Sequence, residues 1–109
     1  MEIQGKNVYM TRGDTEVLTV TCPAKPFTQG DLLELTVREA AGYGPPLIHK
    51  SVTEFTNGAA LVRFAPTDTS GMKFGTYSYD VQVTYQDIGV KTIIKPHDFV
   101  IGKENTYDY

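Results

Sequence analysis

The sequence predicts an all-β domain, a β-sandwich of about seven antiparallel strands. Three observations lead to this prediction. Apolar and polar residues alternate in several short segments, and strand side chains point alternately to opposite faces of a sheet. Clusters of turn-forming residues recur about every eight to twelve positions, which is typical of sandwiches. No segment shows the 3.6-residue apolar period of an amphipathic helix.

The clearest alternation spans residues 75–85 and predicts the central strand. Its apolar face carries Tyr77, Tyr79, Val81, Val83 and Tyr85. Its polar face carries Thr76, Ser78, Asp80, Gln82 and Thr84. Because all of these residues suit a pleated, half-buried surface, we expect the apolar face to line the core.

Three shorter strands are expected before residue 40. The first lies around residues 8–10 and leads into a turn at 12–15. The second covers residues 16–22 and ends at Pro23 and Pro26, which cannot donate to a sheet ladder. After a turn at residues 28–31, the third alternates inward Leu33, Leu35 and Val37 with polar neighbours.

The middle of the chain combines a loop, an edge strand and a return strand. Residues 40–46 carry two glycines and two prolines, a loop composition. Residues 47–55 predict a strand whose apolar and charged residues do not separate cleanly onto two faces. We expect this strand at the edge of a sheet, where charges discourage pairing with other strands. Asn57–Gly58 predicts a type I′ hairpin turn, followed by a return strand over 59–65 with Val62 and Phe64 inward. A longer connection without a helix covers residues 66–74.

Two segments in which apolar and polar residues alternate follow the turn at residues 86–89. The apolar residues fall on even-numbered positions in the first segment and on odd-numbered positions in the second. One extra residue near 95–97 would bring the two patterns onto one face, so we expect a β-bulge there. The inward residues would then be Val90, Thr92, Ile94, Phe99 and Ile101. We therefore assign residues 1–102 to the sandwich domain and 103–109 to a polar C-terminal tail.

Composition narrows the classes of function. The chain has 109 residues and a formal net charge of −3, which disfavours nucleic-acid binding because phosphate contacts need a basic face. No apolar run is long enough to insert into a membrane, and no secretory leader is recognisable at the start. Cys22 is the single cysteine, so we expect that the protein is made in a reducing compartment. We also expect its thiol to be buried and unreactive.

Several short motifs suggest chemistry and are better explained by turns. Arg12-Gly13-Asp14 matches an adhesion tripeptide but lies where a turn favours Gly and Asp. His49 and His97 lack partners at metal-ligand spacing. Aspartates in the loops of a β-sandwich can bind calcium, but here they are dispersed over separate segments: Asp31, Asp68, Asp80 and Asp87. The sequence therefore does not decide whether the chain has a calcium site. We expect no enzyme, no catalytic residue, no metal and no cofactor.

Gly75-x-Tyr77 follows a loop and resembles a tyrosine corner, in which a Tyr hydroxyl bonds back to the preceding loop. Antibody domains carry a cysteine two residues later, where this chain has Tyr79. The resemblance is therefore to the immunoglobulin-like sandwich architecture and not to its disulfide.

The ordered set of short motifs is similar to the N-terminal domain of the baseplate upper protein family of tailed bacteriophages and prophages. The pieces are Gly13-Asp14-Thr15, Phe27-x-x-Gly30-Asp31, Leu47-Ile48-x-Lys50, Pro66-x-Asp68-Thr69, Gly75-x-Tyr77-x-Tyr79-Asp80-Val81, Lys91-Thr92-Ile93 and Phe99-x-Ile101.

The resemblance implies an immunoglobulin-like virion protein, made in the host cytoplasm, that docks to other tail or baseplate proteins. Gly75, Tyr77, Tyr79 and Asp80 would be its structural positions. The sequence in hand ends at Tyr109, without the helical linker or receptor-binding region usual in that family, so we expect docking or assembly rather than host recognition, whether the chain is a complete short relative or a fragment.

For the docking surface we expect a patch of Tyr43, Leu47, Ile48 and Val52, used for partner binding or for a homo-oligomer. Leu47 and Ile48 are consecutive, so both cannot point inward. An alternative function is a carbohydrate-binding or cell-surface adhesion sandwich that uses Tyr43. A small hydrolase is a third hypothesis, disfavoured because no nucleophile and base converge.

Overall fold

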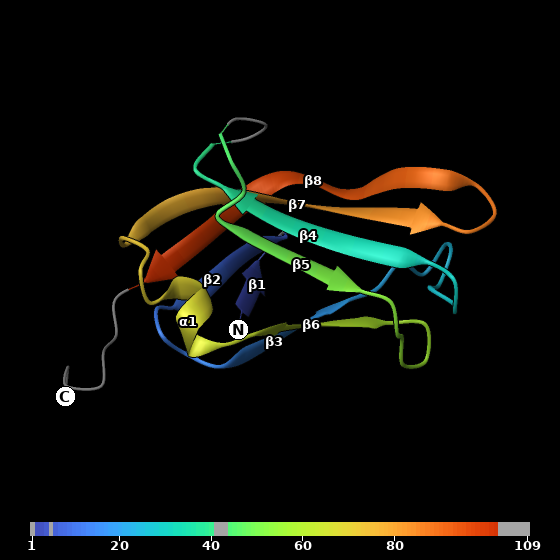
Figure 1. Ribbon diagram of the computed structural model, residues 1–109, viewed down its shortest axis with the longest axis horizontal. Helices are drawn as coiled ribbons and strands as arrows, with labels where there is room; N and C mark the ends of the chain where they lie inside the picture. Colours follow the sequence, from blue (N-terminus) through green and yellow to red (C-terminus); the bar gives the residue numbers. More distant parts are fainter. Residues whose placement is uncertain (1, 5, 41–43, 103–109) are drawn as a thin grey trace.

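The computed structural model describes residues 2–4, 6–40 and 44–102, and it is an all-β sandwich as predicted. The elements in chain order are β1 (Glu2–Gln4), β2 (Asn7–Thr11), β3 (Glu16–Val20), β4 (Leu32–Arg38), β5 (Ile48–Val52), β6 (Ala60–Phe64), α1 (Pro66–Thr69), β7 (Gly75–Tyr85) and β8 (Gly89–Gly102). Figure 1 shows the long β7–β8 hairpin reaching the end of the molecule opposite α1.

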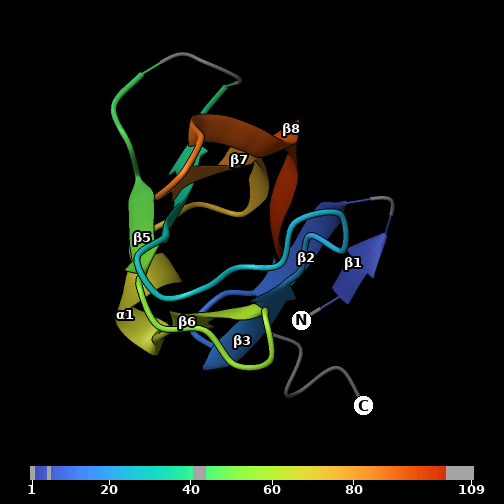
Figure 2. The same cartoon turned by 90° about the vertical axis from the view of Figure 1, so that its right-hand side faces the viewer.

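The strands form two sheets of unequal size. The larger has six strands in the order β1-β2-β8-β7-β4-β5, and the smaller pairs β3 with β6. Figure 2, an end-on view, shows the larger sheet curling over the smaller one, from β5 on one side to β1 on the other. The core lies between them.

The predicted inward face of β7 is confirmed by burial and by register. β7 lies between β4 and β8, and its register with β4 places Leu35 opposite Val81 and Leu33 opposite Val83. Burial of these branched side chains supplies most of the stability of such a core. The other fully buried residues of the centre include Val8, Val37, Val62, Phe64, Tyr79, Phe99 and Ile101.

One strand pair departs from the predicted antiparallel arrangement. β2 runs parallel to the last part of β8, with Val8 opposite Phe99 and Met10 opposite Ile101. Parallel neighbours need a long connection between them, and here nearly the whole domain supplies it. The prediction of a purely antiparallel sandwich is therefore wrong at this edge, where alternation alone gives no strand direction.

The Asn57–Gly58 turn forms, but the strands on its two sides separate. Both residues have positive φ, 52° and 78°, and a single bridge joins Thr56 to Ala59. Beyond that bridge β5 pairs with β4 in the larger sheet, and β6 pairs with β3 in the smaller one. The turn prediction is confirmed, and the expected hairpin pairing of β5 with β6 is wrong.

The predicted bulge in β8 is present, and a second irregularity accompanies it. The register shifts once between Tyr79 and Val81 and again between Val81 and Gln82. Two shifts turn Val90 and Thr92 outward, opposite Thr84 and Gln82, while Ile94 stays half-buried opposite Val81. The expectation that Val90 and Thr92 face the core is therefore wrong.

A short helix, α1, interrupts the connection that we expected to lack one. Pro66 begins it, as proline can because the first helical N–H needs no partner. The Asp68 carboxylate accepts a 2.7 Å bond from the Ala65 N–H and lies 2.8 Å from Lys50 Nζ. Thr69 is fully buried, and its hydroxyl accepts a 2.9 Å bond from the Gly13 N–H, which anchors α1 to the turn after β2.

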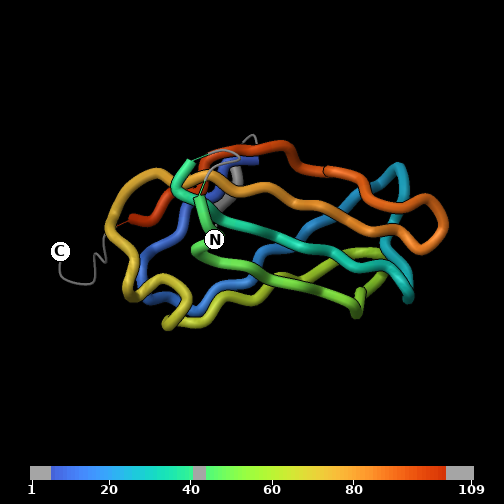
Figure 3. Tube along the Cα trace, turned by 45° about the horizontal axis from the view of Figure 1, so that its top comes forward, coloured from blue at the N-terminus to red at the C-terminus, as the bar shows by residue number. Residues whose placement is uncertain are grey.

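The two ends of the sandwich are formed by different segments of the chain. Figure 3 follows the chain along its length, with the β7–β8 turn at one end and the last residues of β8 at the other. There the Arg12 N–H bonds to the Gly102 carbonyl at 3.1 Å.

Candidate functional site

The β7–β8 turn carries the most exposed large apolar side chains among the described residues. Ile88 is 51% exposed and Val90 is 60% exposed. We call residues 86–91 the hairpin tip; it forms the end of the molecule opposite α1 (Figure 1). Apolar side chains presented at a projecting end are typical of interaction sites.

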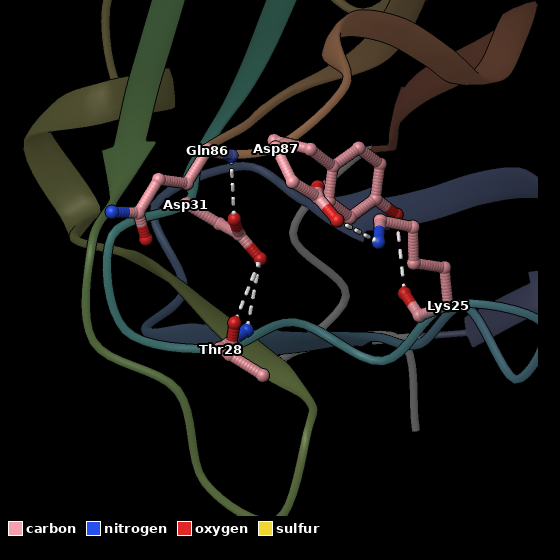
Figure 4. Close-up of polar contacts among 6 residues, drawn as sticks. Lys25, Thr28, Asp31, Gln86 and Asp87 are labelled. Atoms are coloured by element: carbon pink, nitrogen blue, oxygen red, sulfur yellow. Dashed lines mark hydrogen bonds and ion pairs between the residues drawn. The ribbon is translucent and has the colours of Figure 1, made fainter.

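A buried carboxylate fixes this turn to the connection between β3 and β4. Asp31, only 5% exposed, accepts 2.9 Å bonds from the backbone N–H groups of Gln86 and Thr28 and a longer one from the Thr28 hydroxyl (Figure 4). The Gln86 and Thr28 N–H groups hold the pKa of Asp31 below its ordinary value, because they stabilise the charged form.

Gly30 lets the two loops approach closely. Its φ is +100°, and a Cβ at this position would lie 2.2 Å from Gln86 Oε1. Any larger residue would therefore face both backbone strain and a clash with the side chain of Gln86.

Lys25 fixes the turn from a second direction. Its Nζ lies 2.9 Å from Asp87 Oδ2 and 5.1 Å from the centre of the Tyr85 ring. The Tyr85 hydroxyl donates a 3.1 Å bond to the Lys25 carbonyl, and Figure 4 shows Lys25 and Asp87 beside the Asp31 contacts. Burial raises the pKa of Tyr85 to about 12, so this hydroxyl remains a donor at neutral pH.

Aromatic contacts connect a third loop to the same end. The Phe27 ring lies 5.3 Å from Phe55 and 6.2 Å from Tyr85, between centroids. The Phe27 N–H also bonds to the Gly58 carbonyl at 3.1 Å, which fixes the Asn57–Gly58 turn. The hairpin tip is thus one of three connected loops, and a preorganised surface loses little freedom when it binds.

The patch predicted from sequence is only partly at the surface. Leu47 is 41% exposed, whereas Ile48 is 5% exposed and pairs with Val37 in the core. Val52 is half-buried against the core, and Tyr43 lies outside the described residues. The argument that Leu47 and Ile48 cannot both point inward is correct, and Ile48 must be removed from the expected contact surface.

The four predicted structural residues lie along the first half of β7. Gly75 has a φ of 152°, which favours glycine. Tyr77 is half-buried, and its hydroxyl donates a 2.7 Å bond to the Lys73 carbonyl, the back-bond expected of a tyrosine corner. Tyr79 is buried, with its hydroxyl bonded to the Lys6 carbonyl. Asp80 faces outward, 3.7 Å from Arg38.

The Arg12-Gly13-Asp14 segment is a turn, as predicted. The Arg12 guanidinium stacks 4.1 Å from the centre of the Phe74 ring, and its Nη1 donates to the Met72 carbonyl at 3.3 Å. Gly13 has a φ of 84°, and the Asp14 N–H bonds back to Thr11 at 3.2 Å. These contacts hold the segment against the domain.

The two histidines occupy separate surfaces. His49 Nε2 lies 3.0 Å from Glu34 Oε2, and His97 Nδ1 lies 2.6 Å from the Lys95 carbonyl oxygen. Over the part of the chain that the structure describes, no group of three or more His, Cys, Asp or Glu side chains could hold a metal ion. In the same residues no helix has the length and apolar character to cross a membrane.

Sequence reasoning missed the hairpin tip. The segment from Gln86 to Gly89 has turn composition, and turns are expected to be polar. The available signal was an isoleucine within such a turn, at Ile88, where a solvated loop gives no reason for one.

No family model matches the chain, and neither does any curated protein. Among solved structures, it is similar to the crystal structure of a candidate glycoside hydrolase from Bacteroides vulgatus ATCC 8482, with a TM-score of 0.50 and 15% identity. The match covers 92% of this chain and 17% of the other, so this chain spans a small part of that protein. At this identity the similarity shows the fold alone.

Proposed function

We propose that the chain is a non-enzymatic assembly module of a phage or prophage tail or baseplate, which docks to another virion protein through the hairpin tip. The observation that carries the proposal is the exposure of Ile88 and Val90 on a turn fixed by Asp31 and Lys25. The virion setting and its tail or baseplate partners follow from the motif resemblance described above.

The chemistry of the tip defines the partner surface that it fits. Ile88 and Val90 need an apolar pocket, and burial of their remaining exposed surface, about half of each residue, contributes about 2–3 kcal/mol before the losses of association. Lys91 is exposed beside them, so an acidic residue at the rim of that pocket would complement the tip. Asp87 is already paired with Lys25 and does not oppose this arrangement.

The test is co-purification with tail and baseplate proteins from the same phage or prophage, co-expressed one at a time. Ile88→Asp and Val90→Asp should each abolish capture of the docking partner, because an aspartate would be stranded in an apolar pocket. The matched control is Val17→Asp, since Val17 is 41% exposed on β3, outside the hairpin tip. Capture by both tip variants at the wild-type level, with native circular dichroism, would refute docking through the tip.

A carbohydrate-binding or adhesion sandwich is the second candidate, and one surface feature favours it. A polar depression of about 340 Å³ lies on the outer face of β4, β5 and β7, lined by Glu34, Thr36, Arg38, Pro46, His49, Asp80 and Gln82. Such side chains can bond sugar hydroxyls. Glycan-array binding that is lost in Asp80→Ala and retained in Ile88→Asp would favour this candidate over the docking module.

A further inference from the structure

Over the described residues, neither edge of the smaller sheet has a partner strand, and the edge formed by β6 is the one that faces a groove. β6 pairs with β3 on one side, and over the described residues no strand pairs with its other side. The outer edge of β5 is unpaired in the same way. Figure 2 shows these two edges on the side of the molecule where α1 lies. Unpaired edges present backbone N–H and C=O groups that can accept another strand.

A groove of about 670 Å³ lies between these edges, lined by residues 50–56 and 61–63. Its accessible apolar side chains are the half-buried Val52, Phe55 and Leu61, while Val62 behind them is fully buried. Glu54 and Arg63 are exposed at its rim. The groove thus combines a few apolar side chains with a larger number of polar and charged ones, and an extended peptide at a sheet edge can use both through its alternating side chains.

Both ends of the groove are held in place. At one end Lys50 reaches from β5 to Asp68 of α1 at 2.8 Å and lies 5.8 Å from the centre of the Phe64 ring. At the other end the Asn57–Gly58 turn is fixed by Phe27, as described above.

We propose that an extended segment of a partner protein binds in this groove as a strand beside β6 and so enlarges the smaller sheet. Its inward side chains are apolar and contact the half-buried Val52 and Phe55. The residue beside Arg63 is acidic, because the neighbour of Arg63 on β3 is the uncharged Val17 and opposite charges on adjacent strands attract. This contact is separate from the hairpin tip and does not depend on the proposed function.

The probe is a synthetic peptide that copies residues 15–21 with Val17→Glu. β6 already pairs with this sequence through β3, in a register that places residue 17 opposite Arg63. Titration into the ¹⁵N-labelled chain should shift the amide signals of residues 51–55 and 60–64. The control peptide carries Val17→Lys and should bind about five-fold more weakly, the effect of one cross-strand charge pair.

A charge reversal makes the test specific. Arg63 is exposed, so Arg63→Glu should fold normally and should prefer the lysine peptide to the glutamate peptide. Ile88→Asp should bind both peptides as the wild-type chain does, which separates this groove from docking at the tip. The proposal is overturned by an absence of shifts at millimolar peptide, by shifts confined to other strands, or by an unchanged preference in Arg63→Glu. It is also overturned if the chain alone forms a dimer by light scattering that blocks these amides, since the occupant would then be a second copy.

Discussion

The carboxylate of Asp31 accepts a 2.9 Å hydrogen bond from the backbone N–H of Gln86, 55 positions later in the chain. One side chain that precedes β4 therefore fixes the turn that follows β7. Both oxygens of this carboxylate are used, because Thr28 donates to the second one. This buried charge, together with the Lys25–Asp87 ion pair, therefore fixes the position of the hairpin tip.

Replacement of Asp31 by alanine should lower the free energy of unfolding by about 2–3 kcal/mol, because two backbone N–H groups lose a charged acceptor. Urea unfolding monitored by circular dichroism measures the change. Asp14→Ala is the control, since Asp14 is exposed. Equal urea midpoints for the two variants would contradict the role given to Asp31.

The same bonds predict a dependence of stability on pH. Because the folded state holds the pKa of Asp31 below 3.8, the carboxylate stabilises the fold fully above that value. This contribution is lost as the pH falls through the lower pKa of the folded state. Asp31→Asn should therefore lose less stability than the wild-type chain between about pH 5 and about pH 2. Urea midpoints measured across this range test the prediction, and parallel curves for the two chains would rule it out.

Tyr77→Phe should destabilise the domain by about 0.5–1.5 kcal/mol, the net value of one intramolecular hydrogen bond. The hydroxyl bond to Lys73 is accessible to solvent, so the stranded carbonyl can bind water and the cost stays modest. Thermal unfolding of Tyr77→Phe beside Tyr9→Phe measures it, because Tyr9 is 38% exposed. An identical midpoint in both variants would mean that this bond contributes nothing.

Leu35→Ala and Val81→Ala should each cost about 2–4 kcal/mol, through lost burial and the cavity left behind. Both side chains are fully buried and lie opposite each other on β4 and β7. The double variant should cost less than the sum of the single variants, because the two substitutions share one cavity. Urea midpoints close to the wild-type value in both single variants would show that this face is not the core.

The free side of β8 supports a prediction about solubility. β2 pairs with β8 only over residues 99–102, so residues 89–98 have β7 on one side and, among the described strands, none on the other. Lys91, Lys95, Pro96 and the register shifts protect this edge from other strands. Lys91→Val and Lys95→Val should therefore aggregate faster on mild heating, by light scattering, than the exposed-loop control Lys73→Val. Equal rates in the three variants would show that these charges have no protective role.

Local patterns were sufficient for the faces of β4 and β7, because alternation at Leu35 or Val81 depends only on neighbouring residues. They were insufficient for pairing between distant segments. Val8 lies beside Phe99, and nothing near either residue specifies a parallel neighbour. The turn at Asn57 was correct locally, yet β5 and β6 separate because each hydrogen-bonds to a strand of a different sheet, β5 to β4 and β6 to β3.

The residues of the candidate site could not be predicted from local patterns for the same reason. Alternation placed Val90 toward the core, and only the second register shift turned it outward. Ile48 and Leu47 were equivalent choices for the inward position until the pairing with Val37 decided between them. Exposure at a projecting end depends on where the other strands stop, which no single segment encodes.

The parallel pairing of β2 with β8 determines how the domain responds to mechanical tension. A pull applied at residues 2 and 102 first peels β1 from β2, because that antiparallel hairpin opens one hydrogen-bonded pair after another. The force then reaches the start of β2 and the end of β8, at opposite ends of their paired region. Their hydrogen bonds, including that from Arg12 to Gly102, are loaded together in shear. The domain therefore extends easily by a few residues and then resists further extension until the whole pair ruptures at once.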